Sequence, residues 1–310
     1  MLTFSMVYAY SERFMLVLSH DEVVHGKASM LGKMPGTREE QFANLKASYG
    51  YMMCHPGKKL LFMGQDIGEY DEWNENREVE WYLTEEADHK GLQEFVKALN
   101  HLYTSAPALS VKDTSWDGFE WIDCISANDC ILSFVRKGKK DEDMLLVVVN
   151  FANVERKGFQ VGVPLNGKYK EILNSDAKEY GGQGRTNPRV KTAVEEAWDG
   201  REYSIKMTQA PLSVSIFSYQ PYTKEELKEI ARKKAEKARK EKEAARKKKS
   251  AKKAASGRVA KTLKEELEEK VFAAEAKISE NGEVEKPVRV TKPRKRMTEA
   301  ETEENGEEME

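Results

Sequence analysis

An apolar run from Arg13 to Leu18 ends abruptly in the ionisable tripeptide His20-Asp21-Glu22. A second apolar run, Lys59 to Met63, ends at Gly64, and a segment with helical apolar spacing, Arg38 to Cys54, separates the two runs. Near-continuous apolar strands joined by a helix are typical of a parallel sheet that is covered on both faces. We therefore expect two buried parallel strands, the first of which carries polar groups to its carboxyl end, as strands do at the catalytic rim of a barrel.

Two other segments complete this α/β part. Leu2 to Tyr10 has Leu2, Met6 and Tyr10 on one face and predicts a short helix, and Gly91 to Leu109 predicts a longer helix that ends near Pro107. Two strands cannot close a barrel. The two strands could be the last two βα units of a (β/α)8 barrel, so we expect residues 1–110 to form part of one.

From about Asp117 the pattern changes to short strands separated by turn residues. Alternating apolar residues mark several of them, such as those between Met144 and Phe151. Regular spacing of this kind predicts an antiparallel β-sandwich over residues 111–222. The predicted strands are Gly118 to Cys124, Cys130 to Arg136, Met144 to Phe151, Gly158 to Val163, Tyr169 to Asn174, Glu202 to Met207 and Leu212 to Tyr219.

A third region, residues 223–310, is rich in Lys, Glu, Ala and Arg. It carries 26 Lys and Arg against 21 Asp and Glu, whereas residues 1–222 carry 25 against 32. Pairs such as Glu236 and Lys240 have the i,i+4 spacing that supports a helix, but no apolar stripe is present to dock it. We expect a charged tail that is partly helical or disordered, with disorder over residues 279–310.

Composition also bears on location. The three cysteines, Cys54, Cys124 and Cys130, have no short metal-ligand spacing, which favours buried reduced thiols and a reducing compartment. No apolar run approaches the roughly 20 residues of a membrane helix, and Met1 to Leu18 lacks the features of a signal peptide. We therefore expect a soluble cytoplasmic protein with no membrane partner.

The tripeptide and its surroundings closely resemble a known family. His20-Asp21-Glu22-Val23-Val24-His25-Gly26-Lys27 resembles the last acidic signature of the alpha-amylase superfamily (glycoside hydrolase family 13), in the form found in bacterial 1,4-alpha-glucan (glycogen) branching enzymes. The resemblance continues in order along the chain and covers about residues 2–220. It includes Leu2-Thr3-Phe4-Ser5, Lys27 to Gly36, Gln41 to Lys46, His55 to Gly64, Gly118 to Ile122 and Val147 to Phe151.

The resemblance implies roles for individual residues. In this family a nucleophile and an acid/base act on the glycosidic bond, and a third carboxylate binds hydroxyls of the reacting sugar and stabilises the transition state. Asp21 is implied to be that third group, His20 to hydrogen-bond the same sugar, and Glu22 to help order the rim. Trp73 is implied to stack on a glucose face, with core packing an equal alternative. The alternative for Asp21 is a cap on the turn after a strand.

The same resemblance implies what is missing. The nucleophile and the acid/base belong to earlier barrel strands, and no residue here matches them. Asp66, Asp71 and Glu72 are the other rim acids, and Asp66 stands where bacterial members usually have Glu. We therefore expect a C-terminal fragment that binds α-glucan and is inactive in branching by itself. We expect its residues 1–110 to aggregate, or to dock onto a separate N-terminal fragment of the same enzyme if one exists.

Other functions are less favoured. We expect no metal site and no cofactor, because the histidines do not form a ligand set and no glycine-rich phosphate loop is present. The basic run Lys224 to Lys264 could attract nucleic acid, but no aromatic residues interleave with it for base stacking, so we expect no such partner. The alternatives are a non-catalytic glucan-binding scaffold and another hydrolase or transferase of the alpha-amylase superfamily.

Overall fold

The computed structural model describes residues 3–125 and 128–280, and it contains two compact units. Met1–Lys228 form the first unit, and the second begins at Glu229. The first unit includes both the α/β part and the sheets that follow it. The domain boundary near residue 110 therefore stays a prediction.

The α/β part begins with a β-α-β arrangement. Strand β1 (Met15–Leu18) pairs in parallel with β2 (Lys58–Leu61), and Met15 lies opposite Lys58. Helix α1 (Arg38–Cys54) connects them and has the bounds predicted from sequence. Thr37 begins this helix with a capping box, in which the Thr37 hydroxyl accepts from the Glu40 N–H and the Glu40 carboxylate accepts from the Thr37 N–H.

The prediction that both strands are buried was wrong. The side chains of β1 and β2 alternate between exposed and half-buried, and Val17 is 43% exposed. Among the described residues the two strands form a sheet of their own. An apolar run is buried only where neighbouring elements cover it, and this pair lacks cover on one face.

The remaining predicted helices differ in their ends. Helix α2 runs from Ala87 to Ser105, and Pro107 begins a separate 3-10 turn, Pro107–Leu109, because proline cannot continue the hydrogen-bonded ladder. Near the N-terminus only a 3-10 turn forms, Phe4–Val7, in place of a helix from Leu2 to Tyr10. No side chain caps that turn, and its aromatic and β-branched residues favour helix weakly.

The second half of the first unit forms two antiparallel sheets. The larger has the strand order β3-β4-β5-β10-β7-β8, and the smaller pairs β6 with β9. The antiparallel sheets agree with the sandwich prediction, whereas the two-residue strand β8 was missed. The strands are β3 (Phe119–Asp123), β4 (Ile131–Arg136), β5 (Leu145–Asn150), β6 (Arg156–Val163), β7 (Lys168–Asn174), β8 (Lys191–Thr192), β9 (Tyr203–Gln209) and β10 (Ser213–Gln220).

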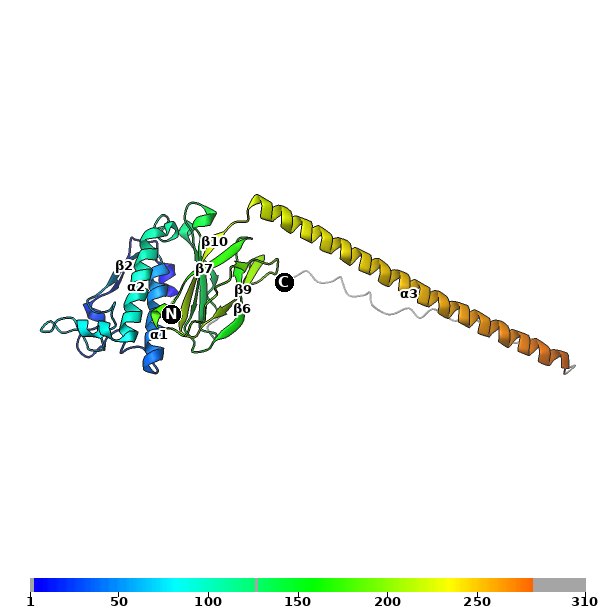
Figure 1. Ribbon diagram of the computed structural model, residues 1–310, viewed down its shortest axis with the longest axis horizontal. Helices are drawn as coiled ribbons and strands as arrows, with labels where there is room; N and C mark the ends of the chain where they lie inside the picture. The colour runs from blue at the N-terminus through cyan, green and yellow to red at the C-terminus, as the bar shows by residue number, and fades with distance from the viewer. Residues whose placement is uncertain (1–2, 126–127, 281–310) are drawn as a thin grey trace, which may run out of the picture. The chain divides into compact units, whose positions relative to one another are not determined.

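Both faces of the six-stranded sheet are covered. Helix α1 lies against one face with α2 packed beside it, and the β6–β9 pair packs on the other face (Figure 1). The helix side holds Leu45, Tyr49 and Val147 in one core. Gly50 lets α1 approach β10, because a Cβ at this position would lie 2.3 Å from the Val214 Cγ1 atom.

A buried ion pair ties the α/β part to the sheets. Arg136 on β4 is fully buried and donates to the Asp113 carboxylate at 2.8 Å. It also donates to the carbonyl oxygens of Cys54, the last residue of α1, and Gly118. One side chain thus joins the end of α1, the connection around residue 113 and the large sheet.

The second unit contains most of α3, which runs from Lys224 to Glu280. Ion pairs at the predicted spacing line it, such as Lys240 with Glu236 at 2.7 Å. The helix includes residues 279–280, the first two of the predicted disordered segment, and the rest of that segment lies outside the described residues. None of the helices in residues 3–125 and 128–280 is sufficiently long and apolar to cross a membrane.

The cysteine prediction held in part. Cys54 is buried at the end of α1, but Cys124 is half-buried and Cys130 is exposed. Burial raises the pKa of the Cys54 thiol to about 12, which keeps it protonated at neutral pH.

Candidate active-site rim

The acidic tripeptide forms a single turn at the carboxyl end of β1. His20–Glu22 is a 3-10 turn, and the Ser19 hydroxyl accepts from the Asp21 N–H at 3.2 Å. The Lys27 ammonium donates to the Asp21 carbonyl oxygen at 2.7 Å. Serine is a good residue to begin such a turn, since its short side chain reaches the free N–H groups. The backbone of the turn is therefore held from both sides.

The Asp21 side chain points away from the core. It is 71% exposed, and the His20 Nε2 atom lies 3.4 Å from its Oδ1 atom. Sequence predicted an acidic group at the end of a parallel strand, and the structure places Asp21 there. The cap alternative was wrong, because the capping oxygen belongs to Ser19 and the Asp21 carboxylate does not cap the turn. The catalytic role of Asp21 stays a prediction.

Aromatic rings gather beside the acid. The Trp73 ring lies edge-to-face with His20 at 5.8 Å and with Phe62 at 5.4 Å between centroids. The backbone N–H of Trp73 donates to the Val23 carbonyl oxygen at 2.9 Å. This bond fixes the loop after β2 to the loop after β1. Trp73 is half-buried, so it both packs against its neighbours and presents part of its ring to solvent.

Glu72 holds the rim together, a role that sequence did not reveal. Its carboxylate accepts from the N–H groups of Gly26 at 2.9 Å and Ala28 at 2.7 Å, and His25 Nδ1 lies 3.3 Å away. Hydrogen bonds from the two N–H groups lower the pKa of Glu72. The contact spans more than forty positions in sequence, so no local pattern could have identified it.

Glu22 is positioned through its backbone. Its carbonyl oxygen accepts from the Lys33 ammonium, which also donates to the Ala28 carbonyl oxygen at 2.9 Å. The Glu22 side chain is exposed, and its role in ordering the rim stays a prediction.

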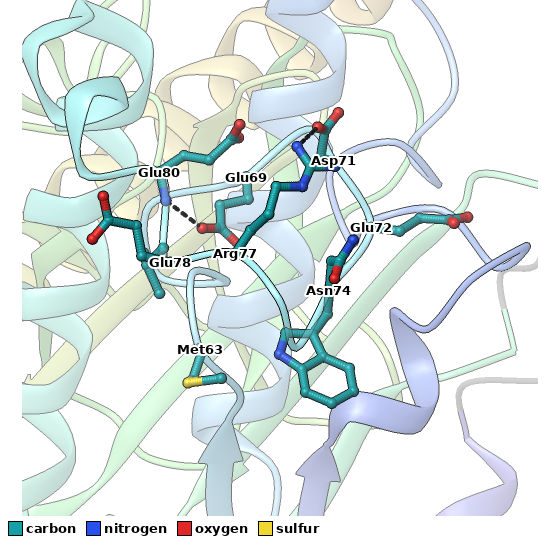
Figure 2. Close-up of a pocket in the computed structure, with 10 residues that line it drawn as sticks. Met63, Glu69, Asp71, Glu72, Asn74, Arg77, Glu78 and Glu80 are labelled. Atoms are coloured by element: carbon teal, nitrogen blue, oxygen red, sulfur yellow. Dashed lines mark hydrogen bonds and ion pairs between the residues drawn. The ribbon is translucent and has the colours of Figure 1, made fainter.

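A pocket of about 120 Å³ lies next to Trp73 in the loop after β2 (Figure 2). Within it Arg77 pairs with Asp71 at 2.9 Å, and the Glu69 carboxylate accepts from the Glu80 N–H at 2.8 Å. Burial raises the pKa of Glu69. Asp21 does not line this pocket, whereas Trp73 does. The lining residues are Met63, Glu69, Asp71, Glu72, Trp73, Asn74, Arg77, Glu78, Val79 and Glu80.

The side chains at the rim that could act as metal ligands are scattered carboxylates and amides. Over the described residues, no group of three or more His, Cys, Asp or Glu side chains could hold a metal ion. What the arrangement offers is an exposed carboxylate, an imidazole and an indole ring within one short stretch of surface. Such groups can hydrogen-bond sugar hydroxyls and cover the apolar face of a sugar ring.

Comparison with known proteins bears on this arrangement. Residues 121–220 match the family model described as the alpha amylase C-terminal all-beta domain. The chain is 48% identical over 230 residues to the 1,4-alpha-glucan branching enzyme GlgB of Geobacillus stearothermophilus. The matched residues make up 74% of this chain and 36% of that protein. It is 48% identical over 219 residues to the enzyme of the same name from Aquifex aeolicus, over 71% of this chain and 35% of that protein.

The sequence matches part of bacterial 1,4-alpha-glucan branching enzymes. It spans about a third of the length of the curated relatives it matches. Among solved structures, AmyP in complex with maltose matches with a TM-score of 0.46 and 15% identity, over 68% of this chain and 41% of that one. The similarity to branching enzymes therefore rests on the sequence matches.

Proposed function

We propose that this chain is part of a 1,4-alpha-glucan branching enzyme and supplies the Asp21 carboxylate to its active site. The observation that carries the proposal is the position of Asp21, which is exposed after the carboxyl end of a parallel strand and lies beside His20, whose ring contacts Trp73. The relatives named above, which match most of this chain, bear the branching-enzyme name.

The proposed reaction transfers a segment of glucan chain. An α-1,4 bond breaks at C1, an aspartate forms a covalent bond to C1, and the departing 4-hydroxyl receives a proton from the acid/base. A 6-hydroxyl of a glucan chain then attacks C1 and gives its proton to the same acid/base; the bond from C1 to the aspartate breaks, the aspartate leaves as a carboxylate, and an α-1,6 branch forms. Asp21 would accept hydrogen bonds from sugar hydroxyls and stabilise the positive charge that develops at C1.

Two neighbouring residues would position the sugar. His20 would hydrogen-bond a hydroxyl of the ring that Asp21 binds, and the exposed part of Trp73 would cover the apolar face of a glucose unit. The contacts of Glu72 with Gly26 and Ala28 would keep the two rim loops in register during the reaction. We assign no residue of this chain to the nucleophile or the acid/base.

The exposed apolar surface of β1 and β2 favours the docking of a partner, which would supply the nucleophile and the acid/base. Apolar side chains are exposed on this strand pair, among them Met15, Val17 and Leu60. Open strand edges and exposed apolar faces favour pairing with further strands. We propose that they dock against the barrel strands found in the other two thirds of the relatives. The partner is then a protein segment bearing the nucleophile and the acid/base.

The proposal also includes a reducing cytoplasmic location. Glycogen-like glucan is its expected substrate, and the buried reduced thiol of Cys54 fits a reducing compartment.

Complementation tests the function. We would mix this chain with the part of the Geobacillus stearothermophilus enzyme that it does not match, and measure the α-1,6 linkages formed from amylose. We expect branching in the mixture and none with either part by itself. An Asp21→Asn chain keeps the size of the side chain but loses its charge, and we expect it to lower the rate at least about a hundredfold. Glu75→Gln, at an exposed position of the loop after β2, serves as the matched control.

Two results would oppose the proposal. Branching by the purified chain without a complement would mean that the catalytic acids lie within it. A complemented Asp21→Asn chain as active as the Glu75→Gln chain would remove Asp21 from the reaction.

A further inference from the structure

Helix α3 has a strongly basic middle. In its first part lysines pair with glutamates one turn away, such as Lys240 with Glu236 at 2.7 Å, and near its end Lys264 lies 3.7 Å from Glu268. Between these pairs, residues 244–264 contain nine Lys and Arg and no Asp or Glu. We call residues 244–264 the basic stretch.

Like charges lie close together along the basic stretch. Lys248 and Lys252, and likewise Lys249 and Lys253, are four positions apart, the spacing at which two charges of the same sign destabilise a helix. None of these four lysines, nor Arg258, has an acidic residue three or four positions away in the sequence. The helix nevertheless continues without a break over this stretch (Figure 1). Negative charge from outside the helix would therefore stabilise it here.

The end of the chain carries the complementary charge. Residues 297–310 contain seven glutamates and no Lys or Arg. Residues 281–296, which connect them to α3, contain six Lys and Arg against two glutamates. The basic stretch would thus repel the connecting residues and attract the last fourteen. A charge partner for the basic stretch is present in the same chain.

The connection is long enough for the two segments to meet. At 1.5 Å per helical residue, position 253 lies about 40 Å before the end of α3. Residues 281–296 span up to about 55 Å when extended. The dipeptide Asn281-Gly282, which favours turns, directly follows the helix, and Pro287 and Pro293 disfavour a continued helix. A segment tethered in this way has an effective concentration on the order of 1 mM.

We propose that residues 297–310 bind back onto the basic stretch of the same chain. Their glutamates would pair with the lysines that have no acidic residue one turn away. The bound segment would cover this run of positive charge and compete with any other polyanion for it. The contact lies within the second unit, and it involves neither the Asp21 rim nor the proposed reaction.

Binding of the full chain to fluorescein-labelled heparin, a soluble polyanion, tests this contact. The chain-end variant replaces four glutamates by glutamine, and the helix variant replaces four lysines by glutamine, which favours a helix about as well as lysine does. The control variant replaces four exposed glutamates of the first unit. The chain-end variant is Glu303→Gln, Glu304→Gln, Glu307→Gln and Glu308→Gln. The helix variant is Lys248→Gln, Lys249→Gln, Lys252→Gln and Lys253→Gln. The control variant is Glu12→Gln, Glu85→Gln, Glu142→Gln and Glu202→Gln.

At about 0.1 M salt charges act over roughly 10 Å, so the effect of a local contact separates from that of net charge. We expect the chain-end variant to bind heparin at least about tenfold more tightly than the wild-type chain, and the control variant to stay within about twofold of it. In the helix variant, the same four glutamate substitutions should change the Kd by less than about twofold, because the surface that they uncover is gone. Equal gains in both backgrounds, or in the control, would overturn the proposal.

Carbodiimide cross-linking identifies the chain that supplies the glutamates. The reagent joins a carboxylate to a lysine amine as an amide, and it takes up the oxygen that leaves. In an equal mixture of unlabelled and isotopically labelled wild-type chains, we expect cross-links between residues 297–310 and 248–253 to join peptides of one isotope only. They should disappear at about 1 M salt, where charges act over only about 3 Å. Cross-links that join the two isotopes equally, or none between these segments, would overturn the proposal.

Discussion

Strands β1 and β5 have similar sequences but very different surroundings. Val17 in the middle of β1 is 43% exposed, whereas Val147 in the middle of β5 is fully buried. Strand β5 has a hydrogen-bonded neighbour on each side, with helices on one face and the β6–β9 pair on the other. Strand β1 pairs with β2 alone among the described residues.

The two regions are therefore covered to different degrees. The sheets close around their own core, while the strand pair beneath the Asp21 rim keeps one face exposed. The two regions are nevertheless joined through α1, Arg136 and the shared core. Stability should therefore come from the sheets and from the contacts of Arg136 with Asp113 and with the end of α1, which we call the seam. The β1–β2 surface should contribute little to stability until a partner covers it.

The largest effect should come from breaking the seam. Arg136→Ala would leave the Asp113 carboxylate buried without its closest cation, and we expect the free energy of unfolding to fall by about 3–5 kcal/mol. Urea denaturation followed by tryptophan fluorescence measures this loss. The double variant Arg136→Met, Asp113→Asn removes both charges and should recover most of it. If Arg136→Ala unfolds at the wild-type urea concentration, the two regions are not joined in this way.

A pH effect should follow at the same seam. His55 is buried beside Arg136, Lys59 and Asp113, and burial lowers its pKa from 6.5 to about 4. Between these values the unfolded chain binds a proton that the folded chain does not, so stability falls as pH drops from about 6.5 to about 4, by up to about 3 kcal/mol. His55→Gln should flatten this part of the stability curve. His101→Gln, at an exposed position on α2, should leave it unchanged, and equal slopes for the two variants would contradict the assignment.

The smallest effects compare the two valines directly. Val147→Ala removes buried methyl groups and should lower the free energy of unfolding by about 2 kcal/mol. Val17→Ala should change it by less than about 0.5 kcal/mol, because the side chain is already exposed. Similar losses for both variants in urea denaturation would mean that β1 is covered in solution by an element of the chain itself.

Local sequence signals predicted much of the fold. The bounds of α1 followed from its apolar spacing and from the turn at Pro56 and Gly57. The longer strands of the sheets were recognisable from alternating apolar residues, whereas β8 has only Lys191 and Thr192 and gave no such signal. The position of Asp21 at a strand end was also predictable.

Long-range contacts were the part that sequence could not supply. Nothing local marks Glu72 as the acceptor for Gly26 and Ala28, or Lys46 as the donor to Tyr180. Burial of β1 and β2 was overestimated for a related reason. An apolar pattern indicates that a strand is suited to burial. It does not identify the element that covers the strand, or whether that element belongs to the same chain.

Hydrogen exchange at β1 and β2 tests the central claim most directly. We would follow peptides covering residues 13–19 and 58–62 by mass spectrometry, with and without the complementing part of the Geobacillus stearothermophilus enzyme, and use residues 145–150 of β5 as the internal reference. We predict that the complement slows exchange in the two rim strands at least about tenfold and leaves β5 unchanged. Unchanged exchange in β1 and β2, in a mixture where the two parts are shown to bind, would contradict the claim that these strands are the docking surface.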